Sequence, residues 1–208
     1  MIPFSQDMAV VGVAKLTAIA SVIVSLEYLT HASILRDGGL MGWAVGRLRY
    51  RWHVAGVRGQ ALDAVLGYPR VLVLLYLRLA VGCFIVLGPT QLVLSAWATA
   101  PAALLSLLFW LRTDYGHDGA DQMIWISFAG LALLSMAPTG VSAEAFLWFV
   151  ALMACHAYVT AGLAKVGAKR WRDGSFLPEI LGTRIYGNES VGRFLLKRPG
   201  YRGSPPCR

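Results

Sequence analysis

Long runs of apolar residues are the feature that most constrains this 208-residue chain. The runs are Met8–Leu29, Val71–Leu87, Leu92–Leu111, Gln122–Ala137 and Ala145–Val166. A helix of about 20 apolar residues can cross a bilayer, because it satisfies its own backbone polar groups. With 57% of its residues apolar and 14% charged, the chain has too little polar surface for a soluble domain. We therefore predict an all-α, polytopic integral membrane protein with about five transmembrane helices in the cell membrane.

Basic residues between the runs predict the topology. The net charge is +8, and nearly every Lys or Arg outside the runs falls between the first two runs, after the third or after the fifth. The turns 88–91 and 138–144 contain none. Cytoplasmic loops are enriched in Lys and Arg, so we predict an N-terminus outside and a cytoplasmic C-terminal tail. This rule accounts for the charge, and we expect no nucleic-acid partner.

The chain is predicted to have two parts. Residues 1–166 form a transmembrane helical domain, and residues 167–208 form a basic cytoplasmic tail. Residues 41–68 mix Arg with Trp, Val and Leu, which indicates one or two amphipathic helices on the cytoplasmic face. An ordered polar loop is the alternative there. Pro101 predicts a kink in the third run.

Arg78 is the most costly residue in the sequence, since it lies near the middle of the second run. An ionised side chain at the bilayer centre costs at least about 2.5 kcal/mol on insertion scales. Lys15 in the first run and His156 in the fifth have a comparable predicted depth, and no acid does. We predict a net basic cavity that binds an anionic or electron-rich ligand, such as a deprotonated quinol, a lipid head group or a carboxylate.

Each of these residues also has a structural interpretation. Arg78 could bond to backbone carbonyls and reach Glu27, while Lys15 extends to the head groups. His156 alone is typical of an interhelical hydrogen bond.

An acidic turn precedes the fourth run. Asp118 is predicted to cap the helix, with Asp121 near its third position and Gln122 beside it, because helix N-termini favour carboxylates. A cation held by Asp114, His117, Asp118 and Asp121 is an alternative on ligand type, but the spacing differs from the EF-hand loop. We predict no metal site.

The cytoplasmic end of the fifth run carries a candidate acid–base group. Cys155, Tyr158, Gly162 and Lys165 fall on one helical stripe, so a ligand could approach Gly162 beside Tyr158 and Lys165. A partly desolvated lysine has a lowered pKa and can accept a proton from a quinol hydroxyl. The alternative is that Lys165 extends into the head groups.

Several short motifs of the chain resemble those of a known family. The motif Ala161-Gly-Leu-Ala-Lys165 is followed by Trp171-Arg-Asp-Gly174 and preceded by the acidic turn 116–123 and by 37–43, Asp-Gly-Gly-Leu-Met-Gly-Trp. Together they resemble the HTTM family, bacterial inner-membrane proteins related to vitamin K-dependent gamma-carboxylase. The similarity runs from about residue 25 to residue 198. DoxX-like quinone-linked proteins have a comparable Gly, Lys and Trp pattern.

The resemblance implies a quinone cofactor. In the carboxylase branch, the lysine that matches Lys165 is regarded as the base that deprotonates the reduced quinone. That branch has an Asn-His pair where this chain has Asp121-Gln122, so no histidine role is carried over. The family normally continues through more membrane helices after the Arg-Pro at 198–199, so we expect no carboxylation of proteins.

The sequence leaves three hypotheses for the function. The first is an HTTM-like protein that binds a quinone or related lipid between its helices, with a redox or proton-transfer role. In this hypothesis Lys165 and His156 are the candidate catalytic residues, and the ligand-binding residues are Arg78, Lys15, Tyr158, Gly162 and Trp171. The second is a non-enzymatic membrane subunit that binds a membrane or cytosolic protein through its basic loop and tail. The third is a DoxX-like or MauE-like partner of an electron-transfer complex.

Overall fold

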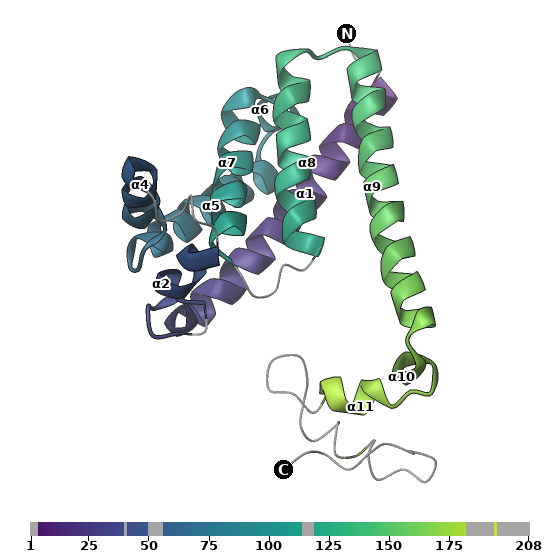
Figure 1. The fold of residues 1–208 in the computed structure, drawn as a ribbon. Coiled ribbons are helices and arrows are strands. Elements are labelled where there is room, and N and C mark those ends of the chain that lie inside the picture. Colours follow the sequence, from purple (N-terminus) through teal and green to yellow (C-terminus); the bar gives the residue numbers. More distant parts are fainter. Residues whose placement is uncertain (1–3, 40, 50–55, 114–118, 182–193, 195–208) are drawn as a thin grey trace. The chain divides into compact units, whose positions relative to one another are not determined.

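The computed structural model describes residues 4–39, 41–49, 56–113, 119–181 and 194. Within these ranges the secondary structure is helical, with no β-strand, which confirms the all-α prediction (Figure 1). The elements are α1 (Phe4–Thr30), η1 (Ala32–Leu35), α2 (Trp43–Gly46), η2 (Arg47–Arg49), α4 (Gly56–Leu66), α5 (Arg70–Leu87), α6 (Thr90–Val93), α7 (Ala96–Arg112), α8 (Gly119–Met136), α9 (Gly140–Gly167), α10 (Lys169–Arg172) and α11 (Phe176–Leu181).

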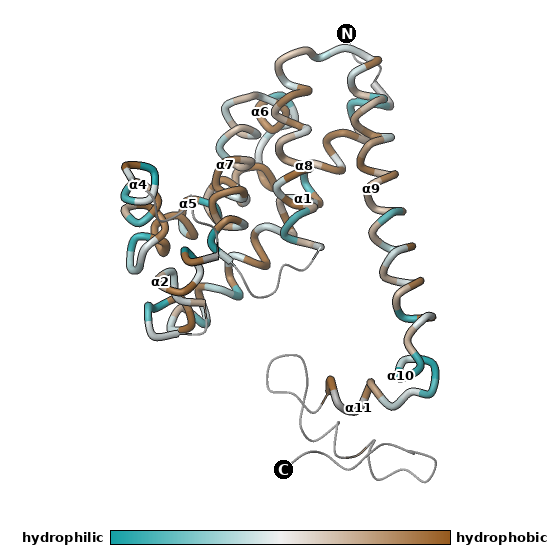
Figure 2. Tube along the Cα trace, viewed as in Figure 1, coloured by the Kyte–Doolittle hydropathy of each residue, from teal (hydrophilic) through white to brown (hydrophobic). Residues whose placement is uncertain are grey.

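Four of the described helices are long and apolar enough to cross a membrane. They are α1, α5, α8 and α9, and Figure 2 shows the hydrophobic residues along them. The apolar helix α7 is shorter, at 17 residues. The predicted runs therefore coincide with helices, and four of them have the length and composition of a membrane span.

The third run differs from the prediction at its start. A single helix that begins at Leu92 is wrong, because the chain turns at Leu94 and Ser95 and α7 begins at Ala96. Pro101 lies within α7, and a kink there stays a prediction. Ser95 has an extended backbone with φ −75° and ψ 149°. Its hydroxyl donates to the Leu92 carbonyl at 2.6 Å, and its own carbonyl accepts the backbone N–H of Thr99 at 3.1 Å. Ser95 thus ends α6 with its hydroxyl and begins α7 with its backbone carbonyl, without a side-chain cap bond to α7.

The chain consists of two compact units, residues Met1–Met153 and residues Ala154–Arg208, and the boundary between them falls within α9. In the first unit α1, α5, α7 and α8 form a closed ring of contacts, α1 with α5, α5 with α7, α7 with α8, and α8 with α1 (Figure 1). The most extensive of these contacts are between α7 and α8 and between α1 and α5. The first unit is therefore built around a four-helix bundle.

Small residues bring α1 and α5 close together. The buried stripe of α1 contains Ala14, Ala18, Ser21 and Ser25 at helical spacing. Opposite it, a Cβ atom added at Gly82 of α5 would lie 2.8 Å from Cγ2 of Val22. Transmembrane helices that pack closely use such small residues, because lipid provides no hydrophobic drive to bring helices together.

Gly82 gives the first testable prediction. The substitution Gly82→Ala forces α1 and α5 apart, because Val22 is β-branched and cannot turn its methyl away freely. We expect a loss of about 1–3 kcal/mol in the free energy of unfolding, measured by denaturant titration in detergent micelles. Gly12→Ala in α1 is the matched control, since nothing lies within 4 Å of its added Cβ. Equal stability of the two variants would contradict close packing at Gly82.

Residues 41–68 contain the short helices α2, η2 and α4, and their position on the cytoplasmic face stays a prediction. Asp63 of α4 holds this segment together, since Oδ1 accepts the indole N–H of Trp43 at 2.7 Å and Oδ2 accepts a guanidinium N–H of Arg47 at 2.7 Å. The backbone carbonyl of Asp63 also accepts from Arg70, the first residue of α5, at 3.1 Å. A single carboxylate thereby joins α2, η2 and α4.

Candidate functional site

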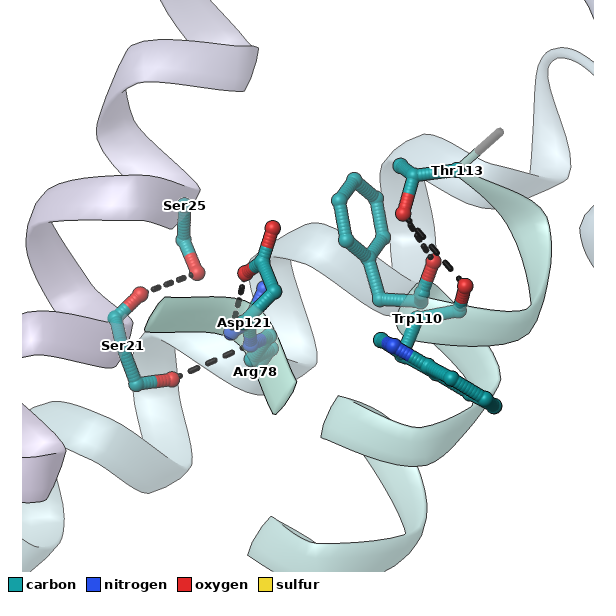
Figure 3. A network of polar contacts seen from close by, with 7 residues as sticks. Ser21, Ser25, Arg78, Trp110, Thr113 and Asp121 are labelled. Carbon is teal, nitrogen blue, oxygen red and sulfur yellow. Dashed lines mark hydrogen bonds and ion pairs between the residues drawn. The ribbon is translucent and has the colours of Figure 1, made fainter. Parts of the chain in front are cut away.

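Arg78 is buried inside the helix bundle, with 3% of its surface exposed. Its Nε donates to the hydroxyl of Ser21 on α1 at 3.0 Å, and Ser25 donates to the backbone carbonyl of Ser21 at 2.6 Å. Its guanidinium carbon lies 5.3 Å from the ring centroid of Phe109 on α7. Figure 3 shows this cluster with Asp121 beside the guanidinium. Arg78 therefore contacts three other helices of the bundle.

The prediction that no acid reaches the depth of Arg78 is wrong. Asp121 lies in the first turn of α8, is 8% exposed, and forms an ion pair with Arg78 in which NH2 and Oδ1 are 3.7 Å apart. Asp121 is the third residue of α8, the position that the sequence predicts, and this first turn lies inside the bundle beside Arg78. Glu27, the alternative partner, is exposed. The protein itself supplies a counter-ion, so a bound anion is not required to neutralise Arg78.

The structure also shows where the rest of the acidic turn lies. Residues 114–118 are outside the described residues, so the cap at Asp118 stays a prediction. The alternative cation site includes three of these residues and is likewise untested. Gln122 is exposed in the first turn of α8. In the described residues no group of three or more His, Cys, Asp or Glu side chains could hold a metal ion.

Arg112 is a second buried arginine, which the sequence analysis counted only as a loop charge. It is the last residue of α7 and is 2% exposed. Its Nε donates to the carbonyl of Leu66 at 2.9 Å, and its NH2 donates to the carbonyl of Leu35 at 2.8 Å. These acceptors end α4 and η1, where backbone carbonyls lack helical partners and attract a cation. Arg112 therefore fixes two helix ends against α7.

An apolar groove lies between α8 and the first half of α9, and nothing in the sequence analysis predicted it. Its volume is about 440 Å³, and its lining is apolar apart from Ser142. The lining residues are Ile126, Ala129, Gly130, Leu133, Leu134, Ser142, Ala145, Phe146 and Phe149. A Cβ atom added at Gly130 would lie 2.8 Å from Cε2 of Phe146, so the missing side chain lets this ring lie against α8 at one wall of the groove.

In the second unit, Lys165 and Trp171 of the segment 161–174 come together. The ammonium of Lys165, in the last turn of α9, lies 5.1 Å from the ring centroid of Trp171. The next residues turn the chain, since Gly174 has φ +74°, which side chains disfavour. The backbone N–H of Ser175 donates to Oδ1 of Asp173 at 3.0 Å. Hydrogen bonds from the backbone and the side chain of Ser175 hold the pKa of Asp173 below its usual value. The extended backbone of Ala168 between α9 and α10, with φ −83° and ψ 117°, lets Trp171 lie over Lys165, and the Asp173–Gly174 turn follows it.

The remaining predicted residues occupy separate positions. Lys15 is half-buried on α1, but Ala14 and Ala18 occupy the buried stripe that leads to Ser21, and Lys15 does not. Tyr158 is 79% exposed, and an added Cβ at Gly162 meets nothing within 4 Å. His156 is exposed and belongs to the second unit. A cavity shared by Arg78, Lys15 and His156 therefore stays a prediction.

Comparison with known protein families, with curated proteins and with solved structures finds no match to this chain. The resemblance to the HTTM family stays a prediction that depends on the motifs alone.

The Arg78–Asp121 pair gives the second prediction. Removing one partner leaves a buried group unpaired, and we expect Asp121→Leu to lower the free energy of unfolding by about 3–5 kcal/mol. We expect the double variant Arg78→Met/Asp121→Leu to lose at least about 1 kcal/mol less than the sum of the two single losses. Denaturant unfolding in micelles measures all three.

Glu27→Gln is the control for the ion pair. Glu27 is exposed on α1, so its replacement should change stability by no more than about 0.5 kcal/mol. Strict additivity of the Arg78 and Asp121 effects would show that the two side chains do not interact.

Arg112 gives the third prediction. Arg112→Met leaves the carbonyls of Leu66 and Leu35 without their donors, which should cost about 2 kcal/mol or more and should speed proteolysis within residues 41–68. Arg112→Lys should not restore either property, because one ammonium lacks the planar fork that reaches both carbonyls. Arg172→Met, at an exposed arginine of α10, is the control. Rescue by lysine would mean that charge alone matters at this position.

Proposed function

We propose that this chain is a five-span membrane protein of the bacterial inner membrane that binds a quinone or a related lipid. In this proposal α7 is the fifth span, the N-terminus is outside and the tail after α9 is cytoplasmic. The excess of Lys and Arg in the segments around α2–α4, after α7 and after α9 supports this orientation. Trp97, 91% exposed near the start of α7, and Trp110, near its end, suit the two membrane interfaces.

The observation that carries the proposal is the apolar groove between α8 and α9. Its volume of about 440 Å³ falls within the range of small-molecule sites, about 300–1,000 Å³. A lining that is apolar apart from Ser142 suits an isoprenoid or acyl chain and provides no charge for a polar solute. We therefore assign the groove to the tail of the quinone or lipid. In this proposal Arg78 holds α5 against α8 through Asp121 and against α1 through Ser21.

Lys165 is the candidate group for proton transfer. The motif resemblance supports this role, and the contact with Trp171 keeps the ammonium close to an aromatic ring at the end of α9. An aromatic face attracts a cation, so Trp171 orients the exposed ammonium of Lys165. His156 and Tyr158 remain candidates on the same helix.

The fourth prediction tests the groove. Ala145→Trp fills the groove, and we expect the amount of quinone that copurifies with the protein to fall at least about tenfold. A tenfold loss of affinity corresponds to the loss of about two buried methylene groups of the tail. Ala80→Trp is the matched control, because Ala80 is exposed on α5 and does not line the groove. Mass spectrometry of lipid extracts measures the quinone per mole of protein.

The same samples separate binding from chemistry. Lys165→Ala should retain its quinone if Lys165 only accepts a proton. Equal quinone in the wild type and in the Ala145→Trp and Ala80→Trp variants would remove the groove from the proposal. The protein would then fit the alternative of a non-enzymatic membrane subunit, which the exposed basic residues Lys169, Arg170 and Arg172 of α10 favour.

A further inference from the structure

Helix α4 has an apolar face on each side, and only one of them is covered by the protein. The covered face contains Gly59, Leu62 and Leu66, spaced at i, i+3 and i+7, with Leu66 fully buried. The other face contains Val57, Ala61, Ala64 and Val65, spaced at i, i+4, i+7 and i+8, and all four are exposed. Val57 is 81% exposed. A helix in water would normally place polar residues on this second face.

Contacts of α4 with the bundle fix its distance from the membrane. Its last carbonyl, on Leu66, accepts from Arg112 at the end of α7. Arg70, four residues after Leu66, begins the membrane-spanning helix α5. Four extended residues reach at most about 14 Å, so the end of α4 lies within that distance of the start of a span. The end of α4 therefore lies close to the predicted start of a membrane span.

The charges around α4 favour a negatively charged partner. Its single acid, Asp63, is occupied by Trp43 and Arg47. Its single base, Arg58, is exposed and follows directly after Val57, at the edge of the apolar face. Beyond the helix, Arg70 is also exposed. An apolar face with a basic side chain at its edge suits contact with the head groups of an anionic membrane, because each basic residue near such a surface contributes about 1 kcal/mol.

We propose that α4 is an interfacial helix whose exposed face, Val57, Ala61, Ala64 and Val65, enters the head-group region of the bilayer while Arg58 binds the phosphate of an anionic lipid. Asp63 and Arg112 hold the helix in the orientation that this requires, through the Trp43, Arg47 and Leu66 contacts. The occupant is the lipid surface in which the protein itself resides. This proposal is independent of quinone binding.

The experiment measures the depth of α4 in the full chain. Spin labels are attached to Val57→Cys and Ala64→Cys in a background without the native cysteines, and the protein is reconstituted in nanodiscs of phosphatidylcholine with phosphatidylglycerol. We expect both labels to collide more often with oxygen, which concentrates in the lipid, than with an aqueous nickel chelate. A label at Asp37→Cys, on an exposed turn after η1, is the control and should favour the nickel chelate.

A lipid competition tests Arg58. Quenching of a fluorophore on Val57→Cys by labelled phosphatidylglycerol is compared with quenching by labelled phosphatidylcholine. Arg58→Gln should reduce the preference for phosphatidylglycerol about fivefold, the factor expected from about 1 kcal/mol per basic residue near an anionic surface. Arg172→Gln, on the exposed α10, should leave this preference unchanged at Val57.

Three results would overturn the proposal. Labels at Val57 and Ala64 that favour the nickel chelate would show that the face is in water. Labels protected from both oxygen and nickel would show that a protein, a second copy or another partner, covers it. An unchanged lipid preference in Arg58→Gln would remove the anionic lipid from the site.

Discussion

The ion pair between Arg78 and Asp121 is the interaction on which the rest of the first unit depends. A charge within an apolar helix is too costly to leave alone, so the fold must bring a counter-ion to it. It does so by placing Asp121 in the first turn of α8 and Ser21 on the buried stripe of α1. The same guanidinium lies over Phe109 of α7. One buried charge thus specifies how α1, α5, α7 and α8 meet.

Arg112 also joins separate helices, at the end of the bundle. It joins the end of α7 to the last carbonyls of α4 and η1, and Asp63 then links α4 to α2 and η2. Short helices outside a bundle would otherwise have few contacts to hold them. These bonds leave an apolar face of α4 exposed in a fixed orientation, and an ordered face of this kind can serve as a contact with lipid. Arg78 therefore holds the helices of the bundle together, and Arg112 holds the short helices α4 and η1 to the end of α7.

The candidate functional features occur in both units. The first unit contains the groove between α8 and α9, where an apolar tail has room. The second unit contains Lys165 under Trp171, and the break between α9 and α10 at Ala168 brings the aromatic ring to the lysine. Quinone binding is proposed for the groove of the first unit, and proton transfer is proposed for Lys165 of the second.

The sequence by itself determined the helical class and the positions of the long helices, because apolar runs of this length leave few other structures possible. It also marked Arg78 as a residue that needs a partner. The partner was a matter of tertiary structure, since Asp121 is 43 residues away along the chain and only the packing of α8 against α1 and α7 brings it to Arg78. The burial of Arg112 and the groove beside Gly130 were likewise decided by packing, because each depends on surfaces from helices that are distant in sequence or joined by a turn. Local composition determines which segments become helices, whereas the contacts between their faces decide which side chains meet.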